Sequence, residues 1–555
     1  MLESWRPIGL LSACSVMLAT LLCWGALDGI PHVQDEIVYT LQARVFAGGD
    51  RWAAESLSWF FWLESPSASA FPPGWPALLA LGEAVGAGWL VNPLLAGALA
   101  PLTLRLVEPL RGRGTAVLAA ALVSLSPGVL LLAASRMSHT SVLVALLLAA
   151  GVLVRDEGGW RRWGASAALG YVVLARPFDA ALVGLPMLAV WSWRRQLSVW
   201  TLPTLAVVVL LFDNAYVTGD ATTWPIDQWF VDRGFGDCNR LGFGERCMGR
   251  YTVMDAATHL WRGAVAFDRL LLGVPGGSVL VALGAWVWRR RALAVGLLVP
   301  LGYALYWSEG LAYGARYWHP LYVVVPAFTA VGLVRLVGLR RAPWVVVAAS
   351  LWGLMGLRGL QDYWCVDDDL AALSGPVQVL TYGSRLNVDP LSGDDGVCSA
   401  DLAMAEALLV PEVQVSMDPL SAGTIAVGDV HDDRWTLLDA AALEVADEDP
   451  DRRIAQAWAL WLMGDEEAAR RRLVGLGRPE HLMPLARLHF VMGEPHIARE
   501  LVDLRLREED PGDPDALLLL ANIEEAEGDT AAGEAAYGRA EAAREDRRAH
   551  GVVLP

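Results

Sequence analysis

The sequence predicts a mainly α-helical membrane domain followed by a soluble tail. Of the 555 residues, 55% are hydrophobic and the mean hydropathy is +0.39, which is more apolar material than one soluble core requires. Residues 1–360 contain 27 Arg and 21 acidic residues, whereas residues 361–555 contain 16 Arg and 40 acidic residues. The chain has no Lys. Such an acidic tail indicates solubility and does not suit nucleic acid, so no nucleic-acid partner is expected.

Residues 1–360 form the expected membrane domain, because their apolar segments have the length that a bilayer requires. The first segment follows Arg6 and lacks a cleavage site, so we expect an anchor with an inside N-terminus. The eleven predicted spans are 8–27, 89–107, 115–134, 139–154, 162–175, 177–193, 197–216, 271–288, 292–307, 318–335 and 343–360.

Arginine clusters predict the sidedness of these spans. Five connecting turns carry them: Arg105, Arg111 and Arg113; Arg155, Arg161 and Arg162; Arg194 and Arg195; Arg289, Arg290 and Arg291; Arg335, Arg340 and Arg341. The positive-inside rule assigns these turns to the cytoplasm. Because the number of spans is odd, we expect a multi-pass protein of the bacterial inner membrane with its C-terminal domain in the periplasm.

Residues 28–88 are predicted to form one long outer loop with two helices at the membrane surface. The second, at 74–88, is too short to span and contains Glu83, and counting it as a span would place Arg105 outside. The motif PPGWP is expected to make a rigid bend before it. The aromatic residues of this loop, expected in the interfacial belt or stacked on sugar rings, are Trp59, Trp62 and Trp75.

Two adjacent carboxylates, Asp35 and Glu36, head the first outer helix, predicted at 35–47. The apolar spacing within 35–47 gives the helix one apolar face and leaves both carboxylates free to face water. Asp35 can cap this helix. It can also act as a general base, because partial desolvation at a membrane surface tunes a carboxylate toward proton abstraction. The two roles are compatible.

Three predicted outer turns each carry one Arg: Arg136 in SRMSHTS, Arg176 in ARPFDA and Arg316 in YGARYWHP. Together they suggest a clamp for an anionic phosphate or pyrophosphate headgroup, while the alternative is three unrelated side chains that snorkel at helix ends. Asp179 is placed to pair with Arg176. His139 can bind phosphate or a metal, assist proton transfer, or be a structural residue.

The cysteines fit an oxidising compartment for the predicted outer regions. Cys238 and Cys247 in the second long outer loop, and Cys365 and Cys398 in the tail, could form two disulfides. Two further cysteines lie in the first span and are expected to be packing residues; they are Cys14 and Cys23. No Cys or His spacing matches a zinc cluster.

Six segments taken in order resemble the GT-C superfamily of membrane glycosyltransferases, nearest to the protein mannosyltransferase and lipid A aminoarabinose transferase type. They are HVQDEIVYTLQARVFAGG, FPPGWPALLALG, WLVNPLLAGAL, SRMSHTSVLVALLLA, LARPFDAALVGLP and YGARYWHPL, and they span most of residues 1–345. The family uses polyprenyl-phosphate-linked sugars. Each motif alone would be weak.

This resemblance implies a catalytic Asp in the first outer loop, matched by Asp35 with Glu36 beside it, and an inverting displacement. It also implies that the arginines stabilise the leaving phosphate. The full set of candidate residues for the donor phosphate is Arg136, His139, Arg176, Tyr313 and Arg316. Some relatives carry a second carboxylate in the next outer loop, where this chain has Ser138, His139 and Thr140. A possible divalent metal and the task of His139 therefore stay open.

The tail is predicted to contain a small α/β linker domain at 361–440 and helical repeats at 441–550. Strands are expected at 377–382 and 424–429, with a helix near 400–410. The segments AWALWLMG, ARLHFVMG and ANIEEAEG resemble degenerate tetratricopeptide repeats, whose stacked helix pairs bind proteins. The alternative is an ordinary helical bundle.

The sequence therefore favours an inverting membrane glycosyltransferase that moves a sugar from a polyprenyl phosphate to a lipid, glycan or protein acceptor on the periplasmic side. A lipid flippase or transporter is the first alternative, but such proteins carry ionisable groups at mid-bilayer depth, and only Asp213 is a candidate. A membrane scaffold that acts through the repeats is the second.

Overall fold

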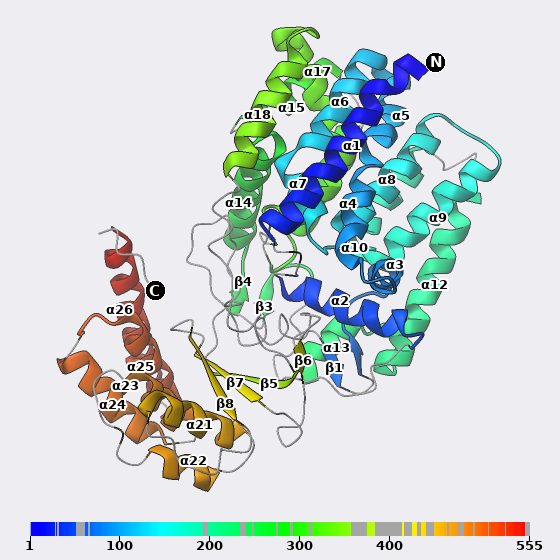
Figure 1. Cartoon of the computed structure of the whole chain (residues 1–555). Helices are drawn as coiled ribbons and strands as arrows, with labels where there is room; N and C mark the ends of the chain where they lie inside the picture. Colours follow the sequence, from blue (N-terminus) through cyan, green and yellow to red (C-terminus); the bar gives the residue numbers. More distant parts are fainter. Residues whose placement is uncertain are drawn as a thin grey trace. The chain divides into compact units, whose positions relative to one another are not determined.

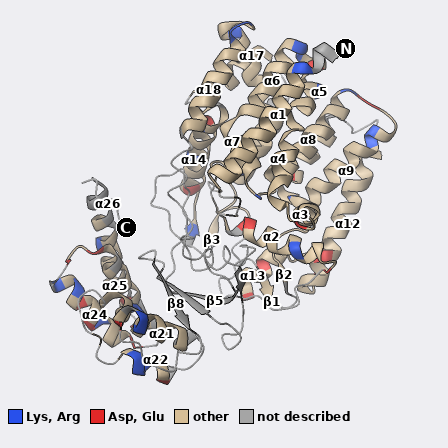
Figure 2. Ribbon diagram, in the orientation of Figure 1, with Lys and Arg blue, Asp and Glu red and all other residues tan. Residues whose placement is uncertain are grey.

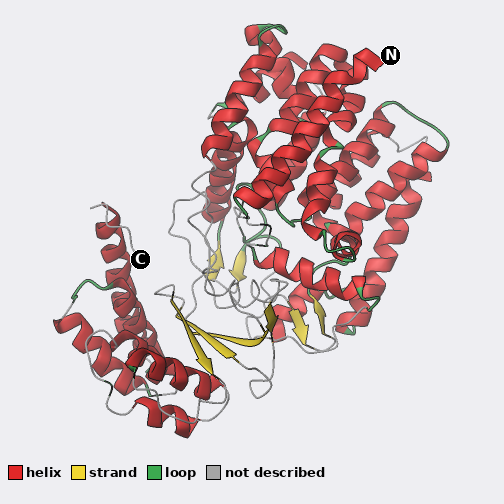
Figure 3. Ribbon diagram, viewed as in Figure 1, coloured by secondary structure: helices red, strands yellow, loops and turns green. Residues whose placement is uncertain are grey.

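The structure is a computed structural model of the chain. It describes 2–50 except 28, 30 and 32; 62–191 except 65–66; 198–356 except 233–239, 247–248, 274–275, 289–291, 309 and 311–312; four tail strands; and 449–549 except 463–465, 474–475, 477–481, 492–493, 509 and 528. The contacts divide the chain into two compact units, of which the first contains Met1–Asp362. The described residues are mainly α-helical (Figure 3).

The first unit is a helical bundle (Figure 1). Its helices are α1 (Leu2–Gly25), α2 (Gln34–Ala47), α3 (Gly74–Glu83), η1 (Gly88–Leu90), α4 (Val91–Ala96), α5 (Leu99–Arg111), α6 (Arg113–Leu125), α7 (Pro127–Ala134), α8 (His139–Val154), α9 (Trp160–Ala175), α10 (Pro177–Asp179), η2 (Ala180–Gly184), α11 (Leu185–Trp191), α12 (Ser198–Thr218), α13 (Pro225–Asp232), α14 (Val253–Leu272), α15 (Gly277–Trp288), α16 (Ala292–Tyr303), η3 (Arg316–Val323), α17 (Val325–Val337) and α18 (Ala342–Gly356). Two antiparallel ribbons accompany them: β1 (Trp62–Glu64) with β2 (Ser67–Ser69), and β3 (Gly244–Arg246) with β4 (Gly249–Tyr251).

Three helical stretches of the described chain are long and apolar enough to cross a membrane. They are Arg6–Gly25, Gly88–Arg111 and Ser198–Thr218. Two bent pairs, α6 with α7 and η3 with α17, would raise the number to five. Four shorter apolar helices are His139–Val154, Pro177–Ala189, Gly277–Trp288 and Ala342–Met355. These helices are compatible with a membrane protein, while the number of eleven spans stays a prediction.

Two of the predicted spans, 115–134 and 318–335, are bent in the structure. The axes of α6 and α7 meet at 49° and those of η3 and α17 at 66°. Pro127 begins α7 and Pro326 lies in the first turn of α17, and a proline has no N–H for the preceding turn, so each helix restarts in a new direction. The second break sets η3, which begins at Arg316, at an angle to the helix that follows.

Charged residues gather toward the ends of the first unit (Figure 2). The start of α1, the turn between α17 and α18 and the turn between α5 and α6 lie at one end, where Figure 2 shows Arg in blue. The helices α2 and α13 lie at the opposite end (Figure 1). The arginine-bearing turns that we assigned to one side of the membrane thus include several at one end of the bundle.

The two helices of the outer loop pack against each other and onto the bundle. α2 begins one residue before its predicted start, and α3 ends at Glu83, earlier than predicted. At Gly74 a side chain would lie 2.6 Å from the backbone of Leu174, so only glycine lets α3 approach the end of α9 this closely. The helix α3 therefore fixes the segment that leads into Arg176.

Trp75 is not available for stacking on a sugar ring or for an interfacial belt. Its side chain is fully buried, and its indole nitrogen donates to the carbonyl oxygen of Arg136 at 2.8 Å. The expectation for Trp75 is therefore wrong, because the bend at PPGWP turns this ring into the protein. Trp59 and the side chain of Trp62 lie outside the described residues.

Cys14 and Cys23 are free cysteines of α1, and Cys23 is buried, as expected for packing residues. The four cysteines of the two predicted disulfides lie outside the described residues; they are Cys238, Cys247, Cys365 and Cys398. The disulfides therefore stay predictions.

The described residues of the second unit form a four-stranded sheet and three helix pairs. The strands are β5 (Gly375–Tyr382), β6 (Val413–Val415), β7 (Thr424–Asp429) and β8 (Arg434–Asp439), in the order β6-β5-β7-β8, with β5 parallel to both neighbours and β8 antiparallel to β7. The helix pairs are α21 (Pro450–Leu462) with α22 (Glu466–Leu473), α23 (Leu482–Val491) with α24 (Pro495–Glu508), and α25 (Pro514–Ala526) with α26 (Thr530–Ala549). The helix predicted near 400–410 lies outside the described residues.

Small residues hold the helix pairs together. Ala457, Ala486 and Ala521 open the three repeated segments and are buried, and Ala498 is fully buried in one cluster with Ala486. Only a methyl group fits where two helices approach this closely. Three stacked helix pairs are compatible with tetratricopeptide-like repeats, whose identity stays a prediction.

We expect Ala498→Leu to destabilise the helix pairs by about 1–3 kcal/mol, because a larger side chain overpacks a filled interface. Pulse proteolysis of the full-length protein in a urea series measures the unfolding midpoint of this unit. Ala531→Leu, at an exposed position of α26, is the matched control and should leave the midpoint unchanged. Equal midpoints for the two variants would contradict the packing.

Candidate active site

Asp35 and Arg316 form an ion pair between the first turn of α2 and the first residue of η3. Arg316 Nη1 lies 3.1 Å from Asp35 Oδ2, and the two side chains are 10% and 17% exposed, respectively. Asp35 does not cap α2, because the N-cap residue is Val33. The capping interpretation of Asp35 is therefore wrong, and the carboxylate is directed to a basic group far along the chain.

Glu36 is fully buried, and three described groups donate hydrogen bonds to it. Its Oε2 accepts from the backbone N–H of Val33 at 3.2 Å and from the Tyr313 hydroxyl at 2.6 Å. Its Oε1 accepts from the backbone N–H of Arg136. The capping carboxylate of α2 is thus Glu36. One buried side chain joins the start of α2, the turn before α8 and the loop before η3.

The loop before η3 has an unusual backbone that Glu36 helps to hold. Tyr313 has φ +58°, in the left-handed region that non-glycine residues rarely adopt. Its neighbour Gly314 has φ +80°, and the N–H of Arg316 donates to the carbonyl of Gly310 at 3.1 Å. Burial, and then the charge of Glu36, raise the pKa of Tyr313 well above its ordinary value, so its hydroxyl remains a donor.

Arg176, the N-cap residue of α10, makes a second ion pair. Its Nε donates to Asp179, and its Nη2 donates to the Tyr303 hydroxyl at 3.0 Å, which itself donates to Asp179 at 2.6 Å. The expected pairing of Asp179 with Arg176 is therefore confirmed. Tyr303 stacks on Tyr317 at a centroid distance of 4.7 Å.

Tyr317 links the two arginines of the site. The guanidinium carbons of Arg176 and Arg316 lie 5.9 and 5.3 Å from the centroid of its ring, within the range of a cation–π contact. Two of the three arginines of the predicted outer turns are therefore neighbours of one aromatic ring, although one precedes α10 and the other begins η3.

Arg136 has a different position. Its Nη2 donates to the carbonyl of Gly29 at 2.9 Å, its Nη1 contacts Thr40 Oγ1 at 3.4 Å, and Glu83 Oε1 lies 3.7 Å from the same Nη1. Glu83 also pairs with Arg44 at 3.3 Å. The guanidinium of Arg136 is thus used to fasten α2 and α3, while its backbone N–H holds Glu36.

His139 and His319 form a buried pair beside this site. Their ring centroids are 6.0 Å apart at an interplanar angle of 86°, and both side chains are buried. Both ring nitrogens of His139 and the Nε2 of His319 have no hydrogen-bond partner within the described part of the chain. The positive charge of Arg176 lies near both rings, and that of Arg316 lies near His139.

The described residues of this site contain few side chains that could bind a metal ion. In the described residues no three or more His, Cys, Asp or Glu side chains are grouped as metal ligands. His139 and His319 offer two imidazoles, and the site carboxylates Asp35 and Asp179 are each paired with an arginine. The metal requirement therefore stays open.

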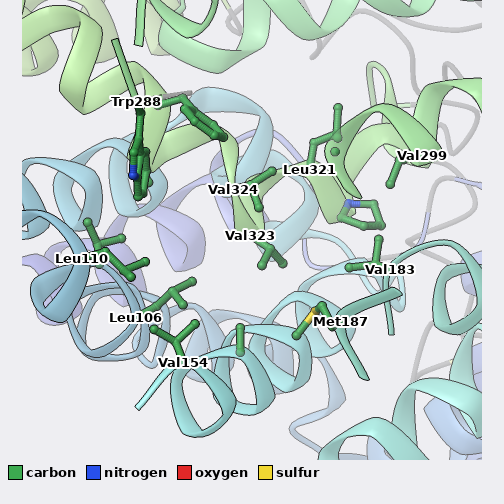
Figure 4. Close-up of a pocket in the computed structure, with 16 residues that line it drawn as sticks. Leu106, Leu110, Val154, Val183, Met187, Trp288, Val299, Leu321, Val323 and Val324 are labelled. Carbon is green, nitrogen blue, oxygen red and sulfur yellow. The ribbon is translucent and has the colours of Figure 1, made fainter. Parts of the chain in front are cut away.

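An apolar pocket adjoins η3 (Figure 4). Its 16 lining residues are all apolar or glycine, and they come from α5, α8, η2, α11, α15, α16, η3, α17 and the residues beside them. Figure 4 shows Leu106, Val154 and Met187 on one wall and Leu321 and Val324 on the facing wall. Leu321 belongs to the same short helix that begins with Arg316. A basic residue and an apolar pocket thus share one helix.

Sequence reasoning missed three aromatic members of the site: Tyr303, Tyr317 and His319. Two of them lie inside YGARYWHP and the third ends the preceding helix, so their signal was proximity to Arg316. Tyr39, one turn after Asp35, was also missed. Burial, and then the charge of Asp35, raise the pKa of Tyr39, so its hydroxyl stays protonated at neutral pH.

Comparison with known proteins yields no relative. No family model matches the chain, and no curated protein matches it at a significant level. The geometry of the Asp35–Arg316 site is therefore the basis for a functional proposal.

Proposed function

We propose that the protein is a membrane glycosyltransferase that moves a sugar from a polyprenyl phosphate to an acceptor at the membrane surface. The observation that carries this proposal is the pairing of Asp35 with Arg316, 3.1 Å apart and almost out of water. A carboxylate and a guanidinium together provide the two charges that the reaction requires. The family resemblance in the motifs around both residues supports the same chemistry.

Asp35 is the general base in this proposal. It takes the proton from the acceptor hydroxyl or amine, whose oxygen or nitrogen attacks the anomeric carbon of the donor sugar. The bond between that carbon and the phosphate oxygen breaks, and polyprenyl phosphate leaves with the electron pair. A single displacement of this kind inverts the anomeric configuration.

Arg316 and Arg176 stabilise the leaving phosphate. Negative charge develops on the phosphate as the glycosidic bond breaks, and guanidinium groups held in a water-poor site are most effective where charge develops. Tyr303 and Tyr317 orient both arginines through the contacts described above. The role of Arg136 is to hold the first outer loop, since its guanidinium already has three partners.

The apolar pocket beside η3 supports a lipid-linked donor. A prenyl chain needs an apolar surface, and the lining of this pocket provides it next to the helix that carries Arg316. We propose a bacterial inner membrane as the location, with the site on the periplasmic side. The three helix pairs of the tail then offer a surface for a protein acceptor or an assembly factor.

The test is an assay of the purified full-length protein in nanodiscs with a panel of polyprenyl-phosphate-linked sugars and a periplasmic extract as the source of acceptors. We expect at least one donor to be consumed, with stoichiometric release of polyprenyl phosphate and transfer of the labelled sugar. Movement of the donor between leaflets without any loss of sugar would overturn the proposal in favour of a flippase.

A further inference from the structure

Arg316 holds unused hydrogen-bonding capacity in a buried position. Its Nε and Nη1 atoms have no hydrogen-bond partner among the described residues, although Nη1 makes the ion pair with Asp35. The nearby rings of His139 and His319 add three more ring nitrogens without partners. Buried polar atoms normally have partners, so this concentration indicates a place that a polar ligand fills.

The charges indicate that this ligand is an anion, but they also show an obstacle. Each arginine of the site already has its own carboxylate: Asp35 for Arg316 and Asp179 for Arg176. The site as a whole is therefore close to neutral. An arriving phosphate gains little from a guanidinium that stays fully paired, so one carboxylate must move away.

The two carboxylates differ in how firmly they are held. Asp179 is 1% exposed and accepts from both Arg176 and Tyr303. Asp35 is 17% exposed, and Arg316 is its only ion-pair partner in the described part of the chain. Moving Asp179 would break a buried network, whereas moving Asp35 breaks one contact at the edge of the site. Asp35 is thus the carboxylate that can be displaced.

We propose that the phosphate group of the donor displaces Asp35 from Arg316, and that this exchange releases Asp35 to act as the base. The inference rests on the proposed function and adds regulation to the same site. Without the donor, Arg316 holds the carboxylate, which is not free to approach an acceptor. With the donor bound, the phosphate takes over Arg316 and the unpartnered imidazole nitrogens. The donor therefore binds before the acceptor is activated.

The exchange makes an unusual prediction for binding: Asp35→Asn should bind phosphate more tightly than the wild type. The neutral side chain no longer competes for Arg316, so polyprenyl monophosphate has no internal anion to remove. We expect the dissociation constant for polyprenyl monophosphate to fall by at least about fivefold, which corresponds to about 1 kcal/mol. Equilibrium binding of radiolabelled polyprenyl monophosphate to the full-length protein in nanodiscs measures it, and Asp35→Ala serves as a second variant with the same expectation.

Matched ligands and variants isolate the cause. Polyprenol, which lacks the phosphate, should bind wild type and Asp35→Asn equally, and Asp213→Asn should bind polyprenyl monophosphate like the wild type. Adding Arg316→Gln to Asp35→Asn should remove the gain. If inorganic phosphate also displaces the radiolabelled polyprenyl monophosphate more strongly in Asp35→Asn than in the wild type, the exchange is supported. The phosphate headgroup alone is then enough to displace Asp35.

Unchanged or weaker binding in both Asp35 variants would overturn the exchange, as would an equal gain for polyprenol. These outcomes are distinct from failure of the proposed function, because the measurement requires no turnover. An enzyme that transfers sugar but shows no gain in binding keeps its function and loses the exchange. A protein that shows the gain but transfers no sugar keeps the phosphate exchange alone.

Discussion

Asp35→Asn is expected to lower the rate of sugar transfer by about 10²- to 10⁴-fold, which is the range that a positioned general base contributes. Asn has the shape of Asp35 and can occupy the same place beside Arg316, but it cannot take a proton from the acceptor. The measurement is the single-turnover release of polyprenyl phosphate by the full-length protein in nanodiscs, with a donor that the wild type consumes.

This variant should remain folded. The contact with Arg316 is a single ion pair at the edge of the site, and Asn keeps the shape of Asp35 and a polar oxygen beside the guanidinium. The matched control is Asp213→Asn, which changes the one carboxylate that a flippase could use at depth and should leave transfer within about twofold. Wild-type transfer by a folded Asp35→Asn protein would end the assignment of Asp35 as the base.

Local patterns predicted the first outer helix well. The apolar repeat through Val38 and Leu41 defined α2 to within one residue, because a helical period is a property of neighbouring positions. The same period shows why Asp35 and Glu36 have different environments: consecutive residues point about 100° apart around a helix. Treating the adjacent carboxylates as one catalytic unit overlooked this difference.

The partners of Glu36 could not be predicted from local sequence. Tyr313 and Arg136 are far from it in the chain, and no periodicity relates a loop to a helix so distant. The pairing of His139 with His319 has the same origin. Such contacts depend on how the bundle folds, which the spans alone do not specify, so Arg136 was predicted to bind phosphate although its guanidinium fastens α2 and α3.

The two bent helices could have been predicted from the sequence. Pro127 and Pro326 lie within the predicted spans 115–134 and 318–335, and a proline inside a helix interrupts its hydrogen bonding. The prediction of these spans used apolar composition and length alone, which carry no information on a bend. The bend after η3 sets the helix that begins at Arg316 at an angle of 66° to α17.

Glu36→Ala is expected to destabilise the first unit by about 3–5 kcal/mol, the cost of removing one member from a buried charged network. The change leaves the Tyr313 hydroxyl and the backbone N–H groups of Val33 and Arg136 without their acceptor in a site that excludes water. Its effect on transfer should follow from loss of the folded protein. Thermal unfolding of the full-length protein in nanodiscs measures the destabilisation.

Two milder variants separate this structural role from chemistry. Tyr313→Phe removes one of the three donors and should cost about 0.5–1.5 kcal/mol, with a lower kcat because the loop that carries Arg316 loses its anchor. Glu36→Gln keeps one oxygen that accepts hydrogen bonds and should be intermediate in stability.

Because Glu36 is fully buried, it cannot reach the acceptor substrate, and the pH dependence of kcat in Glu36→Gln should match that of the wild type. A Glu36→Ala protein with wild-type stability and no transfer would show instead that Glu36 takes part in proton transfer, and the two adjacent carboxylates would then share one role.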